Sequence, residues 1–113
     1  DPFFDINEIL PKVSILISDY SSVVTDYLLI KKKVIFYLHD YDKYYKQIGL
    51  IDDFRKILPG REITSYFELK KEIKNKQFNN KKINQNIQLH IKKYYEVRYK
   101  DSSKQIFNFI KKI

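Results

Sequence analysis

The chain has 113 residues, enough for one domain with an apolar core, and 43% of them are hydrophobic, which excludes an intrinsically disordered protein. It has no cysteine, so disulfides and thiolate metal sites are excluded, and no apolar run approaches the roughly 18 residues of a membrane span. The net charge of +8 favours anionic partners, but only 3 of the 22 basic residues are arginine, which disfavours sequence-specific DNA reading.

The first part of the chain predicts a βαβ unit. Residues 5–10 indicate a short helix that Pro11 ends. The β-branched run at residues 13–17 is typical of a buried strand, residues 22–30 of a helix and residues 33–38 of a second buried strand. Two strands joined by such a helix should be parallel, with a right-handed crossover.

The junction of the first strand with its helix carries the most informative motif. Residues 15–23 read Ile-Leu-Ile-Ser-Asp-Tyr-Ser-Ser-Val, so a strand turns through small polar residues into a helix. The first N–H groups of a helix lack intrahelical partners and its dipole adds positive charge, so this turn is a candidate phosphate site. The hydroxyls of Ser21 and Ser22 are further donors. The same residue types also form ordinary helix caps, and that interpretation stays open.

The middle of the chain predicts a short helix, a loop and an amphipathic helix. Residues 39–47 indicate a short polar helix, and residues 49–60 a loop that ends in a Pro-Gly turn. The sequence Ser65-Tyr66-Phe67-Glu68 is a capping box. The helix after it should carry three apolar residues on one face: Tyr66, Leu69 and Ile73.

Two further amphipathic helices are predicted after a polar connection at residues 75–82. The first is indicated by residues that recur at helical spacing: Ile83, Ile87, Ile91, Tyr94 and Tyr95. The second should begin at the cap Asp101-Ser102-Ser103 and face its own apolar residues inward: Ile106, Phe107, Ile110 and Ile113.

Three segments of the chain resemble one known family. The first is residues 15–37, where the motif above is followed by Asp26-Tyr27 and by Lys-Lys-Val-Ile-Phe-Tyr. The second holds Gly49, Asp53-Phe54 and Leu58-Pro59-Gly60, and the third, weaker match is Tyr99-Lys100-Asp101-Ser102-Ser103. With these segments the chain resembles the CDP-glycerol glycerophosphotransferases, enzymes that build teichoic acids and related polymers. Lys33 departs from the family pattern, which has proline there.

The resemblance implies the two-lobed GT-B glycosyltransferase fold, whose C-terminal lobe binds the donor nucleotide. The expected fold class is therefore α/β: the C-terminal portion of a Rossmann-like GT-B lobe, with a βαβ unit followed by helices. Residues 1–113 are expected to form a single-domain fragment, a piece of the nucleotide-binding lobe of a larger enzyme. The chain begins with aspartate and contains no methionine, which agrees with that expectation.

Four residues are predicted to bind the CDP donor. Ser21 and Ser22 should hold phosphate through their hydroxyls and backbone N–H groups. Asp26 lies four residues after Ser22 and should face the same side, where it would accept hydrogen bonds from ribose or glycerol hydroxyls; the alternative is a buried structural carboxylate bonded to nearby backbone. Asp19 would repel phosphate if it pointed inward, so a structural role is favoured and a ligand contact comes second.

No catalytic residue, cofactor or metal site is assigned within the chain. The histidines that the resemblance implies for acid–base chemistry lie upstream, so the 113 residues alone are not expected to be active. His39 follows the carboxyl end of a strand, where ligands bind in open α/β sheets, but a ligand contact is the minor expectation. His90 is expected on a helix surface. The run Lys31-Lys32-Lys33 is interpreted as a solvated helix end.

The predicted function is donor binding in a CDP-glycerol or CDP-ribitol phosphotransferase that extends a teichoic-acid-like or capsular polymer and releases CMP. Its expected partners are the CDP-alditol donor, an anionic polymer acceptor and the inner face of a bacterial cell membrane, held peripherally from the cytoplasm; nucleic acid is not expected. Two alternatives remain: the C-terminal lobe of a GT-B enzyme that uses a nucleotide sugar, and a non-catalytic basic module for nucleic acid or acidic polymer.

Overall fold

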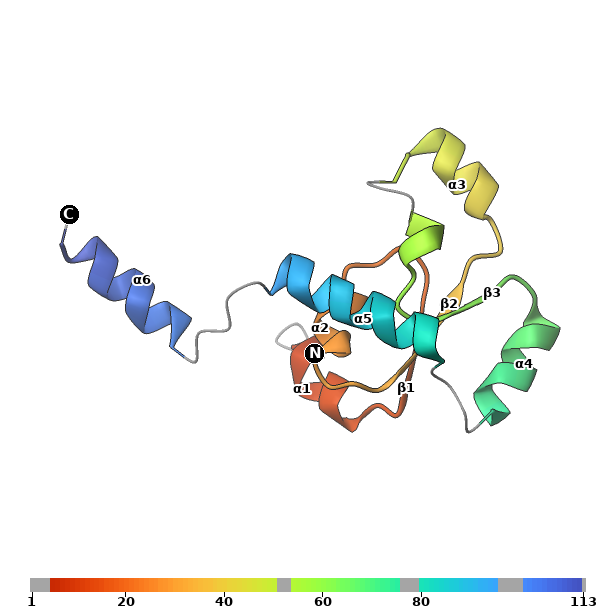
Figure 1. Cartoon of the computed structure of the whole chain (residues 1–113), viewed down its shortest axis with the longest axis horizontal. Helices are drawn as coiled ribbons and strands as arrows, with labels where there is room; N and C mark the ends of the chain where they lie inside the picture. Colours follow the sequence, from red (N-terminus) through yellow and green to blue (C-terminus); the bar gives the residue numbers. More distant parts are fainter. Residues whose placement is uncertain (1–4, 51–53, 76–79, 96–100, 113) are drawn as a thin grey trace.

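Three short parallel strands form the centre of the fold, in the order β1-β2-β3 (Figure 1). The computed structural model describes residues 5–50, 54–75, 80–95 and 101–112. Strand β1 (Ile15–Ser18) pairs with β2 (Lys33–Tyr37), and β2 pairs with β3 (Arg61–Ile63). Helix α2 (Val23–Leu28) joins β1 to β2. The predicted α/β fold with a parallel βαβ unit is confirmed.

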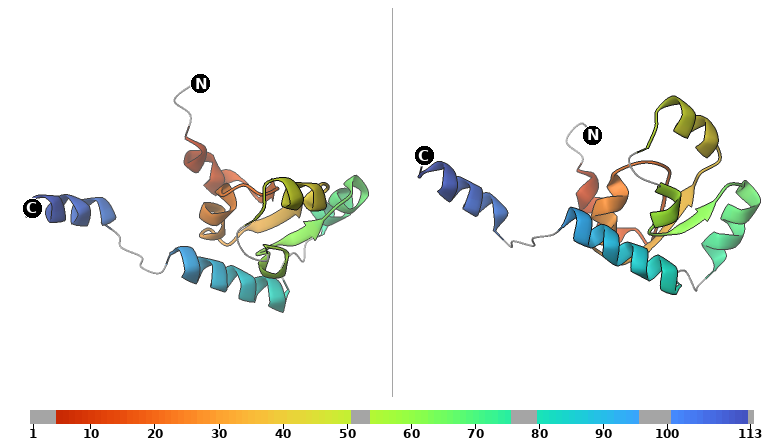
Figure 2. Two further views of the ribbon diagram at one scale, coloured as in Figure 1. Left: turned by 90° about the horizontal axis from the view of Figure 1, so that it is seen from above. Right: turned by 45° about the horizontal axis from the view of Figure 1, so that its top comes forward.

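The other helices surround this sheet or extend from it. They are α1 (Ile6–Ile9), the 3-10 turn η1 (Leu10–Lys12), α3 (Tyr41–Gln47), the 3-10 turn η2 (Phe54–Ile57), α4 (Tyr66–Lys74), α5 (Lys81–Tyr94) and α6 (Ser102–Ile110). Helix α5 runs across the sheet, whereas α6 projects away from it in all three views (Figures 1 and 2).

The core lies between the sheet and the helices α2 and α5. Side chains alternate along β2, so Val34 and Phe36, with Leu38 just beyond, share one face of the strand. These residues form one buried cluster with apolar residues of both helices: Val24, Tyr27, Leu28, Ile83, Ile87 and Ile91. The buried Tyr27 hydroxyl donates to the Val13 carbonyl at 2.9 Å, so this polar group is satisfied inside the core.

The opposite face of β2 holds a buried ion pair. Lys33 is 3% exposed, and its Nζ lies 2.8 Å from Glu72 Oε1 on α4. It also donates to the carbonyls of Glu72 at 2.5 Å and Asn75 at 3.0 Å. Neighbouring Lys32 donates to the carbonyls of Pro11 and Val13. The interpretation of this lysine run as a solvated helix end is therefore wrong for Lys32 and Lys33, whose ammonium groups bind backbone carbonyls.

Strand β3 lies inside a segment for which no strand was predicted. Its three residues, Arg-Glu-Ile, contain no apolar run, so local pattern gives no strand signal. The strand exists because β2 supplies a hydrogen-bonding edge, with Ile35 opposite Arg61 and Tyr37 opposite Ile63. The segment predicted as a loop before it also contains η2.

Helices α4 and α6 form where predicted, but their apolar residues are not buried. The capping box of α4 is confirmed, with Ser65 Oγ accepting from the Glu68 N–H at 3.3 Å, yet Tyr66 is 68% exposed. In α6, Ile106, Phe107 and Ile110 are each more than half exposed, so the prediction that they face inward is wrong; Ile113 lies outside the described residues.

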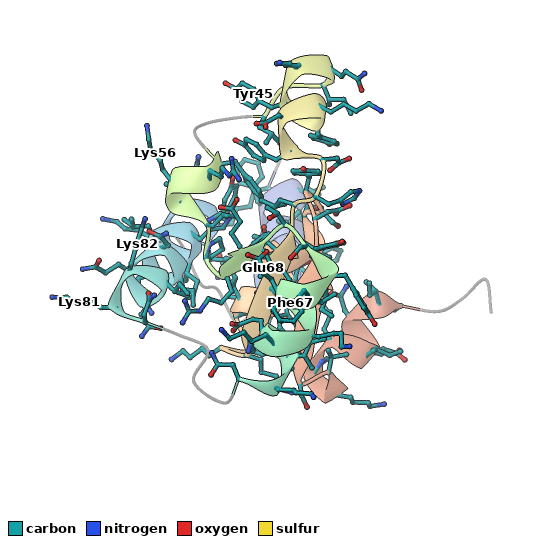
Figure 3. The ribbon with its side chains drawn as sticks, turned by 90° about the vertical axis from the view of Figure 1, so that its right-hand side faces the viewer. Tyr45, Lys56, Phe67, Glu68, Lys81 and Lys82 are labelled. Carbon is teal, nitrogen blue, oxygen red and sulfur yellow. The ribbon has the colours of Figure 1, made fainter. Side chains whose placement is uncertain are left out.

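Basic side chains cover part of the surface. Figure 3 shows Lys56 on η2 and Lys81 and Lys82 at the start of α5 pointing away from the ribbon. All three are exposed, which agrees with the net positive charge of the chain.

Candidate functional site

A cleft of about 390 Å³ lies on the α2 and α5 side of the sheet, next to the carboxyl end of β1. This end of a parallel sheet is where ligands bind in open α/β folds. One part of the lining carries hydroxyls, from Tyr20, Ser21, Ser22 and Thr25. The remaining lining is largely apolar or aromatic: Val24, Phe36, Gly49, Leu50, Phe54, Ile57, Pro59, His90 and Tyr94. The structure thus places both predicted serines in one cavity.

The turn from β1 into α2 leaves its polar groups loosely engaged. Ser21 Oγ accepts from the Val23 N–H at 3.4 Å, and the Val24 N–H reaches the Ser21 carbonyl at 3.5 Å. Both distances exceed the usual limit of about 3.2 Å for such bonds. Ser22 makes no side-chain capping bond, and both serines are exposed. Since α2 has only six residues, hydroxyls and individual N–H groups matter more here than a helix dipole.

Tyr20 anchors this turn to α3. Its hydroxyl donates to Asp40 Oδ1 at 3.0 Å, and its ring stacks on Tyr44 with centroids 3.8 Å apart. Burial, and then the hydrogen bond to Asp40, raise the pKa of the Tyr20 phenol well above its usual range. The phenol therefore stays protonated as a donor. Sequence reasoning gave Tyr20 no role, because its partners lie about twenty residues away.

The two predicted carboxylates do not line the cleft. Asp26 Oδ1 accepts a hydrogen bond from the Tyr95 hydroxyl at 2.6 Å, which ties α2 to the end of α5. Burial, followed by this bond and the nearby charge, raises the pKa of Tyr95 to about 12. The contact gives Asp26 a structural role, but the carboxylate is exposed and its partner is a distant tyrosine hydroxyl, not nearby backbone. Asp19 is exposed and is also absent from the lining.

His90 lies on the surface of α5, as expected, and it also lines the cleft, which was not predicted. It is half-buried, and its ring lies 5.0 Å from the Tyr94 ring at an angle of 42°. Burial, and then the charge of Lys93, lower the pKa of the imidazole, which favours its neutral form. The spacing could have predicted this position, because His90 lies three residues after Ile87 and therefore borders the apolar face of the helix. His39 is exposed, stacks on Tyr37 and does not line the cleft.

The Pro-Gly turn before β3 forms part of the cleft wall. Pro59 lines it, and Gly60 is buried beside it. A Cβ on Gly60 would lie 2.6 Å from the Val34 carbonyl oxygen and 3.0 Å from the Phe36 ring, so a glycine is required. Three further residues of the family match, Asp53, Tyr99 and Lys100, lie outside the described residues.

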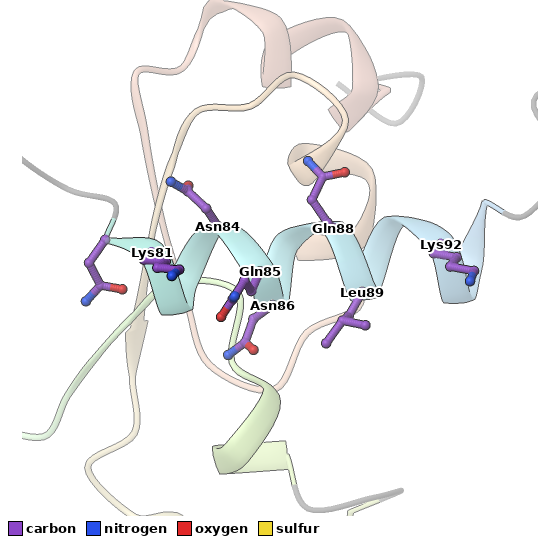
Figure 4. Close-up of a pocket in the computed structure, with 8 residues that line it drawn as sticks. Lys81, Asn84, Gln85, Asn86, Gln88, Leu89 and Lys92 are labelled. Carbon is purple, nitrogen blue, oxygen red and sulfur yellow. The ribbon is translucent and has the colours of Figure 1, made fainter.

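A larger hollow, of about 930 Å³, lies along α5 (Figure 4). Its lining comes from this one helix and its N-cap: Asn80, Lys81, Asn84, Gln85, Asn86, Gln88, Leu89 and Lys92. A trough along a single helix lacks convergent groups from several elements, so the 390 Å³ cleft is the better candidate site. In the described part of the chain, no three His, Asp or Glu side chains gather as metal ligands, and no helix is both long and apolar enough to cross a membrane.

Comparison with known proteins gives consistent matches. Residues 1–112 match the family described as CDP-Glycerol:Poly(glycerophosphate) glycerophosphotransferase. The teichoic acid glycerol-phosphate primase of Bacillus subtilis is 31% identical over 106 residues, 94% of this chain and 26% of that protein. The teichoic acid poly(glycerol phosphate) polymerase of Staphylococcus epidermidis is 36% identical over 81% of this chain and 12% of that protein.

Solved structures agree with these matches. The wall teichoic acid polymerase TagF superposes with a TM-score of 0.76 and 32% identity, over 97% of this chain and 27% of that one. A TagF variant soaked with CDPG gives a TM-score of 0.75 at 31% identity, over 97% of this chain and 27% of that one. The chain therefore spans little more than a quarter of the length of these proteins at most.

Proposed function

The chain belongs to the CDP-glycerol:poly(glycerophosphate) glycerophosphotransferase family, and on this premise we propose that its cleft binds the nucleotide end of a CDP-alditol donor. The family relation makes it a relative of transferases of teichoic acid synthesis. The finer assignment, donor binding by this part of the protein, rests on the cleft. Ser21 and Ser22 are the residues that we assign to the donor phosphates.

The single observation that carries this proposal is the loosely bonded turn inside the cleft. A pyrophosphate needs several donors at once, and this turn offers two serine hydroxyls and first-turn N–H groups at 3.4–3.5 Å from their present acceptors. Charge-assisted hydrogen bonds to phosphate oxygens are about twice as strong as neutral ones. The turn thus gains more from binding an anion than it loses in local bonds.

The same groups suit the proposed reaction. An acceptor hydroxyl attacks the β-phosphorus of the CDP-alditol, the bond to the bridging oxygen breaks, and CMP leaves with that oxygen. Negative charge then grows on the departing CMP. Hydroxyl and N–H donors fixed beside it stabilise that charge without reorganising. Acid–base groups for the acceptor hydroxyl are not assigned to the described residues.

The test replaces both serines in the intact protein. Ser21→Ala combined with Ser22→Ala should weaken CDP binding on the order of 100-fold, because each hydrogen bond to a charged group contributes roughly 1.5 to 3 kcal/mol. The melting temperature should change little, since Ser22 makes no capping bond and that of Ser21 is long. Calorimetric titration with CDP measures the first quantity and thermal melts the second.

Ser65→Ala is the matched control. Ser65 caps α4 and lies outside the cleft lining, so its loss should cost about 1 kcal/mol of stability and leave CDP affinity unchanged. If the double serine variant behaves like this control, with a lower melting temperature and an unchanged dissociation constant, the turn is structural and the proposal fails.

We also propose that the protein contacts an anionic membrane surface through α6. The helix exposes Ile106, Phe107 and Ile110, and Lys104 and Lys111 lie on the same short helix or at its end. Each lysine near an anionic surface contributes about 1 kcal/mol, and salt weakens the attraction. Vesicle binding by the intact protein should therefore require anionic lipid, fall with salt and weaken in Lys104→Glu with Lys111→Glu. Equal binding to neutral vesicles would refute the idea.

A further inference from the structure

The cleft has a second wall, formed by α5. His90 and Tyr94 lie one turn apart on this helix, with their rings 5.0 Å apart, and both line the cavity that holds the serines. The 2.6 Å hydrogen bond from Tyr95 to Asp26 fastens this end of α5 to α2. His90 and Tyr94, the aromatic wall of the cleft, are thus held beside α2, the helix that follows the serine turn.

The space between the two walls is lined by flat and apolar groups. Phe36 and Phe54 pack edge to face, with centroids 5.7 Å apart at 86°, and Ile57 and Pro59 complete this part of the lining. A nucleoside diphosphate has the same two-part chemistry, a polyanion joined to a flat heterocycle. Bases stack on aromatic side chains, so the phosphate belongs at the hydroxyls and the base among the rings.

The His90 ring is open to a ligand. His90 and Ile57 also line a second hollow of about 330 Å³, together with Asn86, Leu89 and Lys93, so His90 has free space on two sides. No hydrogen bond within the described part of the chain engages its ring nitrogens. A neutral imidazole offers one donor and one acceptor, which is what recognition of a base edge requires.

We propose that His90 and Tyr94 seat the pyrimidine base of the nucleotide donor, with His90 bonding to its polar edge and Tyr94 covering one face. This inference rests on the proposed function, because it assigns the base once the phosphates lie at the serines. Cytosine presents an amino donor where uracil presents a carbonyl acceptor. A residue that bonds to this edge therefore contributes to the choice between CDP and UDP.

The test titrates the intact protein with CDP, UDP and inorganic pyrophosphate. His90→Phe keeps an aromatic ring and removes the nitrogens, so CDP affinity should fall about 3- to 10-fold. The dissociation constants of CDP and UDP should also become more similar. Tyr94→Ala should weaken both nucleotides by about 5- to 100-fold through lost stacking. Neither change should alter pyrophosphate affinity. Tyr94 is 53% exposed, so its truncation leaves the core intact, and His39→Phe, outside the cleft, is the matched control.

The outcomes separate the two proposals. If both α5 variants bind CDP like the wild type while the double serine variant does not, the base lies elsewhere and only this inference is overturned. If they lose pyrophosphate and CDP affinity together, α5 acts through the serine turn, and the inference is again overturned. If the wild-type protein binds neither CDP nor pyrophosphate, the proposed function fails and this inference fails with it.

Discussion

Replacing Lys33 by methionine should destabilise the protein far more than the same replacement of a lysine on the surface. The ammonium of Lys33 forms an ion pair with Glu72 Oε1 at 2.8 Å and donates to the carbonyls of Glu72 and Asn75 at 2.5 and 3.0 Å. The side chain therefore joins β2 to the C-terminal end of α4 from a position that is 3% exposed.

The cost follows from what Lys33→Met leaves behind. The Glu72 side chain is 15% exposed, and its other ion-pair partner among the described residues is Arg61, whose Nε lies 3.9 Å away. The carbonyls of Glu72 and Asn75 also lose the hydrogen bonds that Lys33 donates to them. Removing one partner of a buried pair typically costs about 3 to 5 kcal/mol, and the partial exposure of Glu72 favours the lower end of that range. A loss of about 3 kcal/mol is a large fraction of the stability of an ordinary domain.

Urea unfolding of the wild type, of Lys33→Met and of the pair Lys33→Met with Glu72→Leu measures this cost. The double variant removes both charges, so it should recover at least half of the loss. Lys71→Met, on the exposed surface of the same helix, should stay within about 0.5 kcal/mol of the wild type. A loss below about 1 kcal/mol for Lys33→Met alone would refute the reasoning.

Three other predictions follow from the described contacts. Gly60→Ala should cost about 1 to 3 kcal/mol in urea unfolding, because its Cβ would lie 2.6 Å from a backbone oxygen; an unchanged midpoint contradicts this. The Tyr95 phenol has a pKa raised from 10.0 to about 12, so the folded state keeps a proton that the unfolded state loses, and stability should fall between pH 10 and 12. Melting temperatures of Tyr95→Phe should fall less steeply over that range, and parallel curves would exclude the effect. The pKa of His90 is lowered from 6.5, so below that pH the unfolded state binds a proton more readily than the folded state does. The free energy of unfolding should therefore decrease as the pH falls below 6.5. His90→Phe should flatten this acid limb in melts at about pH 7.5 and 5.5, and an equal slope would contradict the assignment.

Patterns confined to one element predicted the fold well. The β-branched runs before and after α2 indicated β1 and β2 because such runs are typical of strands. Burial is confirmed for β2, but the prediction that the first strand is buried is wrong: β1 lies at the end of the described strand order, and its Ile17 is 45% exposed. The capping box at Ser65 and the spacing of Ile83, Ile87 and Ile91 predicted α4 and the buried face of α5. Strand β3 was missed because its pairing with β2, rather than its own composition, creates it.

Features that join distant segments could not be predicted from the sequence. Burial of Lys33 depends on Glu72, 39 residues further along the chain, and no local signal connects them. In the candidate site, the motif predicted Ser21 and Ser22, whereas the wall from α5 with His90 becomes visible only when that helix is folded over the sheet. Asp26 was predicted from its spacing and from the family motif, neither of which indicates its contact with Tyr95, 69 residues further along the chain.

The anchoring of Tyr20 has a consequence for the thermodynamics of ligand binding. Many phosphate-binding loops use glycine to reach their shape, but residues 18–25 contain none. Here the stack on Tyr44 and the bond to Asp40 fix the backbone just before Ser21. The entropy of ordering the turn is then lost during folding, before any ligand arrives, so an anion that binds there bears a smaller entropic penalty. The packing of the Tyr20 ring on Tyr44, a residue outside the cleft lining, thereby becomes a determinant of affinity.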